Sequence, residues 1–379
     1  MSGKRVLVLS FSPLDRDPRV HRELSFLAGR YRATAAGFSP PRLNGVDFVP
    51  LRNAGRPGAG KILAAARLLG RSYEAFYWSH PMIRSALSAL SGAAFDLMIA
   101  NDAWALPIGS RLAETRGAPL FFDAHEYSPR EHEESLSFRL FHAGLWDYVC
   151  RAYLPRARAM TSVCKGLAEE YEKNYGAECG VITNAPFYED LAPRPLQPGR
   201  VRMVHHGSAD PARRLESMIR LMGLLDERFG LDFFLVGLES PYGRRLRDMA
   251  AGDRRIRFLA PVPMESIARA INPYDVGLYL LHPANFNAKM ALPNKVFEFI
   301  QARLALAVWP APEMARLVRE HGCGVVSEDF SPGSMARALS RLSEADLSSM
   351  KSRSAAAAPL VAGERNRELF LQIVENLLS

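Results

Sequence analysis

Three residues of one short segment, Pro293, Lys295 and Glu298, have the chemistry to hold a nucleotide. Proline suits the first turn of a helix, where its missing N–H costs nothing, and apolar residues follow at helical spacing. A helix that begins at the carboxyl edge of a parallel sheet directs free N–H groups and a positive dipole end at an anion. Lys295 adds a mobile cation, and the Glu298 carboxylate offers two acceptors to a ribose diol. The segment predicts a site for the diphosphate and ribose of a nucleotide; an ordinary capped helix is the alternative.

A second group of candidates follows the expected strand 201–206. Gly207 and Ser208 would let a ligand approach the backbone closely, and Arg213 and Arg214 stand near the start of the next expected helix. Two guanidinium groups at that place oppose the helix dipole unless an anion lies there. The pattern indicates a diphosphate, and a solvated basic turn is the alternative.

In the first half of the chain, His125 and Glu126 stand just past the expected strand 120–123. A histidine at the ligand edge of a sheet can donate to a developing negative charge or orient a sugar hydroxyl. A loop histidine bonded to the backbone is the alternative. Asp15 and Asp17 have the spacing of an Asp-x-Asp metal pair, but we interpret that segment as a loop with a helix cap and expect no bound metal.

The composition bounds the class of protein. The chain has 379 residues, of which 48% are hydrophobic, enough for two domains with their own cores. The net charge of +8 favours an anionic partner, but no nucleic-acid-binding module is present, so we expect no nucleic acid partner. The four cysteines lack metal-ligand spacing and indicate reduced thiols. No apolar run reaches the length of a membrane span and no signal peptide is visible, so we expect a cytoplasmic protein.

Strand-length apolar runs alternate with helical segments along the chain, which is typical of parallel sheets with helices on both faces. The alternation stops at 186–200, where four prolines predict a linker, and then restarts. We predict the α/β class, with two doubly wound, Rossmann-like parallel-sheet domains facing a cleft, at 1–185 and 201–360. The first loop lacks the G-x-G-x-x-G pattern, so we expect no dinucleotide site there.

The expected strands are 4–11, 34–38, 96–100, 120–123, 159–163, 180–183, 201–206, 232–237, 255–259, 274–281, 304–309 and 323–327. The expected helices are 18–30, 60–77, 81–93, 104–116, 136–154, 164–175, 212–228, 241–250, 263–271, 293–302, 312–320, 333–345 and 364–378.

Together these features resemble the two-domain GT-B glycosyltransferases, and most closely the retaining glycosyltransferase family 4 group. The resemblance covers nearly the whole chain, and the order and spacing of its motifs carry it more than any single motif does. The motifs are Asp17–Glu23, Phe95–Asp102, Asp123–Glu126, Asn184–Pro186, His206–Ser208 with Arg213 and Arg214, and Leu292–Glu298.

The resemblance implies that the second domain holds a nucleotide-sugar donor and the first an acceptor. Arg213 or Arg214 matches the family lysine that contacts the diphosphate, and Ser208 stands near the usual arginine. Glu298 matches the second glutamate of the E-x7-E element, which holds the ribose, and His125 is similar to the histidine near the reacting sugar carbon. The implied residues are His125, Arg213 and Arg214 for catalysis; Gly207, Ser208, Arg213, Arg214, Val262, Met290, Pro293, Asn294, Lys295 and Glu298 for the donor; and Asp17, Arg19 and Glu126 on the acceptor side.

Three further points follow from the resemblance. The segment around Val262 would read the base through its backbone, and the final helix, 364–379, would pack back on the first domain. Met290 departs from the family pattern, because it stands where the first glutamate of E-x7-E is expected. Ala302-Arg303 departs likewise from the usual Ala-Gly before the next strand.

We therefore expect a metal-independent, retaining, hexosyltransferase-like enzyme of polysaccharide or glycoconjugate biosynthesis, without a bound cofactor. It would move a sugar from a UDP-, GDP- or dTDP-sugar to a hydroxyl of a sugar, lipid-linked or small-molecule acceptor. A nucleotide-sugar epimerase on the same architecture is one alternative, although it needs acid/base carboxylates that the sequence does not show. A catalytically silent scaffold subunit is the other, and Met290 keeps that alternative open.

The segment 52–84 carries six basic residues against one acid, Glu74. A basic amphipathic helix with aromatic residues can lie on an anionic membrane surface, so we consider a peripheral contact with the inner face of a membrane. A core-packed helix with a solvated basic face is the alternative. The apolar residues at helical spacing are Ile62, Ala66, Leu69, Tyr73 and Phe76.

Overall fold

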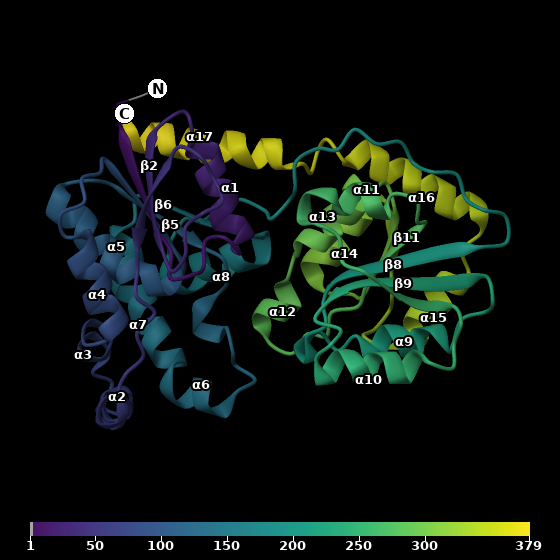
Figure 1. The fold of residues 1–379 in the computed structure, drawn as a ribbon, viewed down its shortest axis with the longest axis horizontal. Helices are drawn as coiled ribbons and strands as arrows, with labels where there is room; N and C mark the ends of the chain where they lie inside the picture. Colours follow the sequence, from purple (N-terminus) through teal and green to yellow (C-terminus); the bar gives the residue numbers. More distant parts are fainter. Residues whose placement is uncertain (1–2) are drawn as a thin grey trace. The chain divides into compact units, whose positions relative to one another are not determined.

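The computed structural model describes residues 3–379 and shows two compact α/β domains (Figure 1). The first comprises the described residues up to Thr183 together with Asn285–Asn287 and Asn366–Ser379; the second comprises Asn184–Ala284 and Ala288–Arg365. Every strand pair in both domains is parallel. The predicted fold class, two doubly wound parallel sheets, is confirmed.

The first domain is built on a seven-stranded sheet of order β3-β2-β1-β4-β5-β6-β7. The order reverses between β1 and β4, which is where doubly wound sheets bind ligands beyond the carboxyl ends of their strands. Helices cover both faces of this sheet, so its central strands are buried and mostly apolar. The strands are β1 (Arg5–Leu9), β2 (Arg32–Gly37), β3 (Val46–Pro50), β4 (Leu97–Asn101), β5 (Leu120–Ala124), β6 (Ala159–Ser162) and β7 (Gly180–Val181).

The last helix of the chain is part of the first domain's core. The Phe370 ring lies 5.7 Å from that of Phe26 and 5.6 Å from that of Phe121, between centroids, and Figure 1 shows this helix beside α1. The helices of this domain are α1 (Pro18–Leu27), α2 (Gly58–Leu69), α3 (Tyr73–Trp78), α4 (Pro81–Leu90), α5 (Asp102–Arg116), α6 (Leu136–Phe141), α7 (Ala143–Tyr153), α8 (Lys165–Tyr175) and α17 (Gly363–Leu378).

The second domain has a six-stranded sheet of order β10-β9-β8-β11-β12-β13, with its reversal between β8 and β11. The strands are β8 (Val201–Ser208), β9 (Phe229–Val236), β10 (Ile256–Leu259), β11 (Val276–Tyr279), β12 (Ala305–Val308) and β13 (Gly324–Val326). The helices are α9 (Glu216–Met222), α10 (Pro241–Ala250), α11 (Ile267–Ile271), α13 (Asn294–Gln301), α14 (Pro312–His321), α15 (Pro332–Ser340) and α16 (Glu344–Ala357). Helix α12 (Phe286–Met290) has its first two residues in the first domain and the rest in the second.

The predicted linker is extended and fastened to the second domain by Arg303. This arginine has the left-handed backbone conformation (φ 61°) that glycine favours, and its side chain is buried. Its guanidinium donates to the carbonyls of Glu189 and Leu191 in the linker and of Gln301 in α13. The arginine that replaces the expected glycine therefore holds the linker in place, which a glycine could not do.

Three elements were not predicted: strand β3 and the helices α12 and α16. Strand β3 is a half-exposed edge strand that ends in a proline, so it lacks the buried apolar run by which the other strands are visible in the sequence. Helix α16 lies in the alanine-rich stretch and has little amphipathic pattern. A capping box of Ser343 and Asp346 starts it, and its buried Lys351 donates to the carbonyl of Tyr274 and lies 3.4 Å from the Asp275 carboxylate.

Several predicted helices were too long, and in three of them the chain breaks or the helix begins later than expected. The expected helix 60–77 breaks at Gly70 and Arg71, where Arg71 takes a positive φ of 54°, so α2 and α3 are separate. The expected helix 136–154 breaks at His142. The expected helix 212–228 begins only at Glu216, because Arg214 has a left-handed backbone (φ 48°).

Within residues 3–379, no helix combines the length and the apolar character needed to cross a bilayer. All four cysteines are free thiols, as predicted.

Candidate functional site

In the second domain, the carboxyl end of β8 brings Gly207 against Lys295. Gly207 has a φ of 142°, a conformation that residues with side chains rarely adopt, and Lys295 lies in the first turn of α13. A Cβ atom at Gly207 would lie 2.5 Å from Cε and 3.0 Å from Nζ of Lys295. The glycine therefore leaves the space through which the lysine amine reaches the switch point of the sheet.

The amine of Lys295 sits among groups that disfavour its charge. Burial, and then the guanidinium of Arg213, lower its pKa below the ordinary value, and Glu298 opposes this. Within the described chain neither Lys295 nor Arg213 forms an ion pair with an acidic side chain. Two neighbouring cations without a bonded counter-ion are the setting in which an anionic ligand gains most.

Lys295 and Arg213 line a small cavity of about 80 Å³, together with Ser208, Tyr279, His205 and one acid, Asp210. The Asp210 carboxylate accepts from the backbone N–H of Ala212. The Lys295 amine lies 5.7 Å from the centre of the Tyr279 ring. The Tyr279 hydroxyl is buried beside the Arg213 guanidinium, and its O–H has no acceptor among the described residues. Two cations and an unused hydroxyl donor therefore face one space, which suits phosphate oxygens.

Glu298 lies one turn after Lys295 and is nearly buried, at 7% exposed. Its Oε2 lies 3.2 Å from Nε2 of His206, which forms no hydrogen bond within residues 3–379. The neighbouring His205 points to the other face of β8, where its Nδ1 lies 2.9 Å from the Leu278 carbonyl. Glu298 is thus an acceptor with one histidine neighbour at the carboxyl edge.

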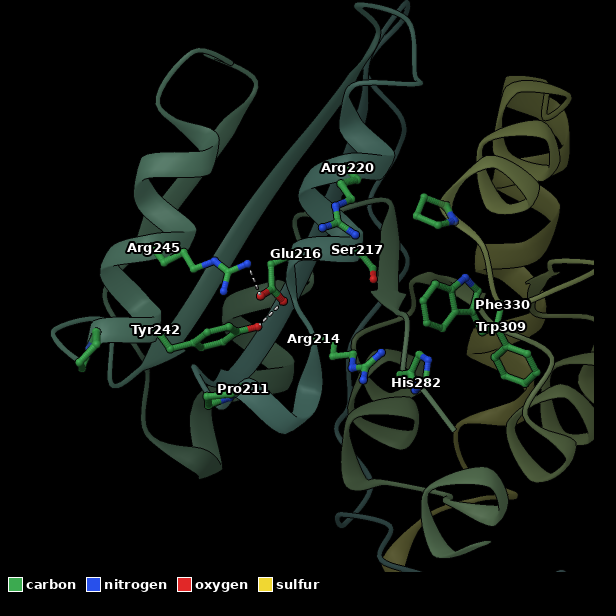
Figure 2. Close-up of a pocket in the computed structure, with 12 residues that line it drawn as sticks. Pro211, Arg214, Glu216, Ser217, Arg220, Tyr242, Arg245, His282, Trp309 and Phe330 are labelled. Carbon is green, nitrogen blue, oxygen red and sulfur yellow. Dashed lines mark hydrogen bonds and ion pairs between the residues drawn. The ribbon is translucent and has the colours of Figure 1, made fainter. Parts of the chain in front are cut away.

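The structure separates the two arginines that the sequence grouped. Arg213 lines the small cavity with Lys295, whereas Arg214 lines a larger cavity beside it with His282 (Figure 2). The left-handed backbone at Arg214 turns the chain between them. Of the pair, Arg213 is the one that joins the predicted diphosphate site.

The other predicted donor residues are more scattered. Pro293 takes the extended N-cap position rather than the first turn, so α13 begins at Asn294. Met290 is the last residue of α12, and Val262 lies in the loop after β10. Neither Met290 nor Val262 lines the cavity of Lys295.

In the first domain, Arg19 is buried rather than available to an acceptor. Its guanidinium forms two short hydrogen bonds with the buried Asp123 carboxylate and donates to the Ile182 carbonyl at 2.8 Å. Glu23, also buried, is hydrogen-bonded to Asp123 and accepts from Asn101. Burial and the neighbouring Asp123 raise the pKa of Glu23 well above its usual range, whereas Arg19 holds the pKa of Asp123 low. Glu23 therefore keeps the shared proton.

The same network positions His125. Its Nδ1 lies 3.2 Å from Oδ2 of Asp102, and its Nε2 lies 2.9 Å from Oδ1 of Asn101 and 3.5 Å from Asp123. The backbone N–H of His125 also donates to Asp102, which has a φ of 65°. Asp102 thus has a left-handed backbone conformation and contacts both the ring and the backbone N–H of His125. Strained backbone of this kind is often found at functional sites.

Carboxylate oxygens of Glu23 and Asp123 and a ring nitrogen of His125 lie within 4.8 Å of one another, the spacing of a metal site. Both Asp123 oxygens, however, are already bonded to Arg19, which supplies the positive charge there.

The remaining first-domain residues have plainer roles. Asp17 caps α1, as predicted, by accepting from the backbone N–H groups of Arg19 and Val20. The Glu126 side chain is exposed, and its carbonyl accepts from Tyr171.

Sequence reasoning gave no role to Tyr279, Asn101 or Asp102, although the motif Phe95–Asp102 ends in the last two. The last two directly follow the expected strand 96–100, at the edge where ligands bind, and that position was the available signal. No signal in the sequence identifies Tyr279, because the residues beside it belong to α13 and to the loop after β8.

No protein-family model matches this chain, and no curated protein sequence matches it. Its fold is similar to that of several solved structures. HepE from Anabaena, crystallised with UDP, is 14% identical, with a TM-score of 0.70 over 98% of this chain and 99% of that one. Sucrose-phosphate synthase from Thermosynechococcus elongatus is 11% identical, with a TM-score of 0.71 over 99% of both chains. WaaG, a glycosyltransferase involved in lipopolysaccharide biosynthesis, is 12% identical, with a TM-score of 0.60 over 96% of this chain and 99% of that one. These likenesses show the two-domain GT-B fold.

Proposed function

We propose that this protein is a glycosyltransferase that moves a sugar from a nucleoside diphosphate-sugar to an acceptor hydroxyl. The observation that carries the proposal is the pair of cations, Lys295 and Arg213, beside Gly207 at the switch point of the second sheet. The pair lies where doubly wound sheets bind ligands, and its charge suits a diphosphate.

The cations have a direct role in the chemistry. Negative charge grows on the diphosphate as its bond to the sugar breaks, and preorganised donors at that place lower the barrier. Lys295, Arg213 and the start of α13 supply such donors. This is the basis for proposing a reaction without a metal ion. Glu298, at the same edge, would accept from the ribose hydroxyls.

In the first domain, His125 would face the reacting sugar, with Asp102 and Asn101 holding its ring.

We propose retention of configuration, as the resemblance to glycosyltransferase family 4 implies. For the donor we propose a UDP-sugar first, because HepE, which has the same fold, was crystallised with UDP-glucose. Met290 lacks the carboxylate of the family glutamate. We therefore propose that the backbone of Ala288–Met290 contacts the donor sugar.

For the acceptor we propose a lipid-linked sugar reached at an anionic membrane surface. The apolar residues Ile62 and Leu69 of α2 are 74% and 67% exposed, which disfavours the alternative of a core-packed helix. Ala64 and Leu68 pack inward instead. Arg56 and Arg67 donate to carbonyls of α3 and keep their charge. Among the described residues, Lys61 and Arg71 have no acidic partner either.

A panel of UDP-, GDP- and dTDP-sugars tests the proposal through release of nucleoside diphosphate in the presence and absence of acceptors. Release is expected with one donor, and Lys295→Ala and Glu298→Gln should reduce it. Conversion of a donor to its epimer would instead show the epimerase. If no donor is consumed and no nucleotide binds, the proposal is wrong and the scaffold alternative is favoured.

A further inference from the structure

A second, larger cavity of about 770 Å³ lies in the same domain, and the chemistry proposed above does not use it. Its walls come from the loop after β8, the starts of α9, α10 and α15, and the ends of β11 and β12 (Figure 2). The volume is within the usual range for small-molecule sites.

The polar side of this cavity is positive. Arg214, Arg220 and Arg245 line it against one acid, Glu216. That carboxylate accepts from the Tyr242 hydroxyl at 2.7 Å and lies 3.9 Å from Arg245, as the dashed lines in Figure 2 show. Within residues 3–379, neither Arg214 nor Arg220 has an acidic partner. Two guanidinium groups are therefore free to bind an anion.

The opposite side is aromatic. Trp309 and Phe330 form an edge-to-face pair with ring centroids 6.0 Å apart. Trp309 is 1% exposed, and its Nε1 has no hydrogen-bond partner among the described residues; Nδ1 of His282 also lacks one. Burial, and then the Arg214 guanidinium, lower the pKa of His282. Aromatic faces and unused ring nitrogens suit a hydroxyl-bearing ring.

We infer that this cavity binds a hexose phosphate, with its phosphate on Arg214 and Arg220 and its ring against Trp309 and Phe330. The site is distinct from that of Lys295, which lines the small cavity and not this one. The inference goes beyond the proposed transfer reaction and stands without it, because binding can be measured with no donor present.

Calorimetry on the full-length protein tests it with glucose 6-phosphate, mannose 6-phosphate, glucose and inorganic phosphate as probes. At least one hexose phosphate should bind with a Kd below about 1 mM, more tightly than inorganic phosphate, and glucose should not bind. Arg220→Ala should weaken binding by about tenfold or more, since a charged hydrogen bond is lost. Arg341→Ala, an exposed arginine of the same domain outside the cavity, should leave it unchanged.

Two further measurements locate the ligand. Trp309 is the one tryptophan of the second domain, so binding should change fluorescence, and Trp309→Phe should abolish the change. Saturating UDP should leave hexose phosphate binding intact. The inference is overturned if no hexose phosphate binds, if Arg220→Ala has no effect, if UDP displaces the ligand, or if inorganic phosphate binds as tightly.

Discussion

Gly207 and Lys295 share one region of space, because a Cβ atom on the glycine would lie 2.5 Å from Cε of the lysine. The glycine, at the end of β8, and the lysine, in the first turn of α13, are brought together by strand order. The small cavity beside them keeps its cations only while residue 207 has no side chain. Adding one methyl group at residue 207 therefore tests whether Lys295 belongs to the anion site.

Gly207→Ala should displace Lys295 and weaken UDP binding by about ten- to hundredfold, the scale of one charged hydrogen bond. It should also cost about 1–3 kcal/mol of stability, because the backbone there has a φ of 142°. Calorimetry with UDP and thermal unfolding measure the two effects. Gly199→Ala is the matched control, since that glycine also has a positive φ but stands in open space. Equal UDP affinity in both variants would remove Lys295 from the site.

The affinity for UDP should depend on pH through Lys295. Its pKa is lowered in the free protein, and a bound diphosphate would raise it again. Affinity should therefore be highest below the free-state pKa and fall as the pH rises from there toward the pKa of the complex. Lys295→Arg keeps the charge over that range, so its UDP affinity should stay flat in a calorimetric pH series. A parallel decline in both proteins would mean that another group titrates.

Part of the small cavity could be predicted from the sequence, and part could not. The sequence alone identifies Lys295 and Glu298, because a proline before a helix marks the carboxyl edge of a sheet. It identifies Gly207 because a glycine directly after a buried strand marks the same edge. The contact between Gly207 and Lys295, and the separation of Arg213 from Arg214, depend on which strands are neighbours and on one left-handed residue. Helical periodicity grouped Ile62 and Leu69 into one apolar face but could not tell whether that face packs on a core, because a short surface helix buries only part of its apolar residues.

Folding stability should depend on pH through Glu23. In the unfolded chain this carboxyl ionises near its ordinary pKa of 4.5, whereas in the folded protein it stays protonated to a higher pH. Its contribution is therefore fully present below pH 4.5 and is lost as the pH rises through the folded pKa, at no more than about 1.4 kcal/mol per pH unit. Glu23→Gln keeps both hydrogen bonds without a proton to lose.

Chemical denaturation from pH 4.5 to 8 measures this difference. The Gln variant should lose less stability than the wild type as the pH rises, and Glu368→Gln, on an exposed part of α17, should behave like the wild type. Parallel curves for all three proteins would show that Glu23 ionises normally in the fold.

His125 and Asp102 should affect turnover and not nucleotide affinity, because the cations proposed to bind the nucleotide belong to the other domain. His125→Ala should lower kcat by about a hundredfold, the usual loss for one donor at a developing charge. Asp102→Asn keeps a residue that tolerates a positive φ and removes only the charge, so about a tenfold loss is expected. Steady-state kinetics and UDP calorimetry separate the two quantities. Normal turnover per folded molecule with a lower melting temperature would make His125 a structural residue.

Exposed apolar residues on α2 should bind the first domain to anionic membranes. Ile62 and Leu69 are 74% and 67% exposed, and each nearby basic residue adds about 1 kcal/mol at such a surface. In co-sedimentation, binding should require vesicles with anionic lipid and fade as salt rises, because salt screens the charges. Replacing both residues with serine should abolish it, whereas Leu224→Ser, an equally solvated leucine (57% exposed) of the second domain, should not. If the protein stays in the supernatant with anionic vesicles at low salt, the exposed face of α2 serves another partner and a soluble acceptor is favoured.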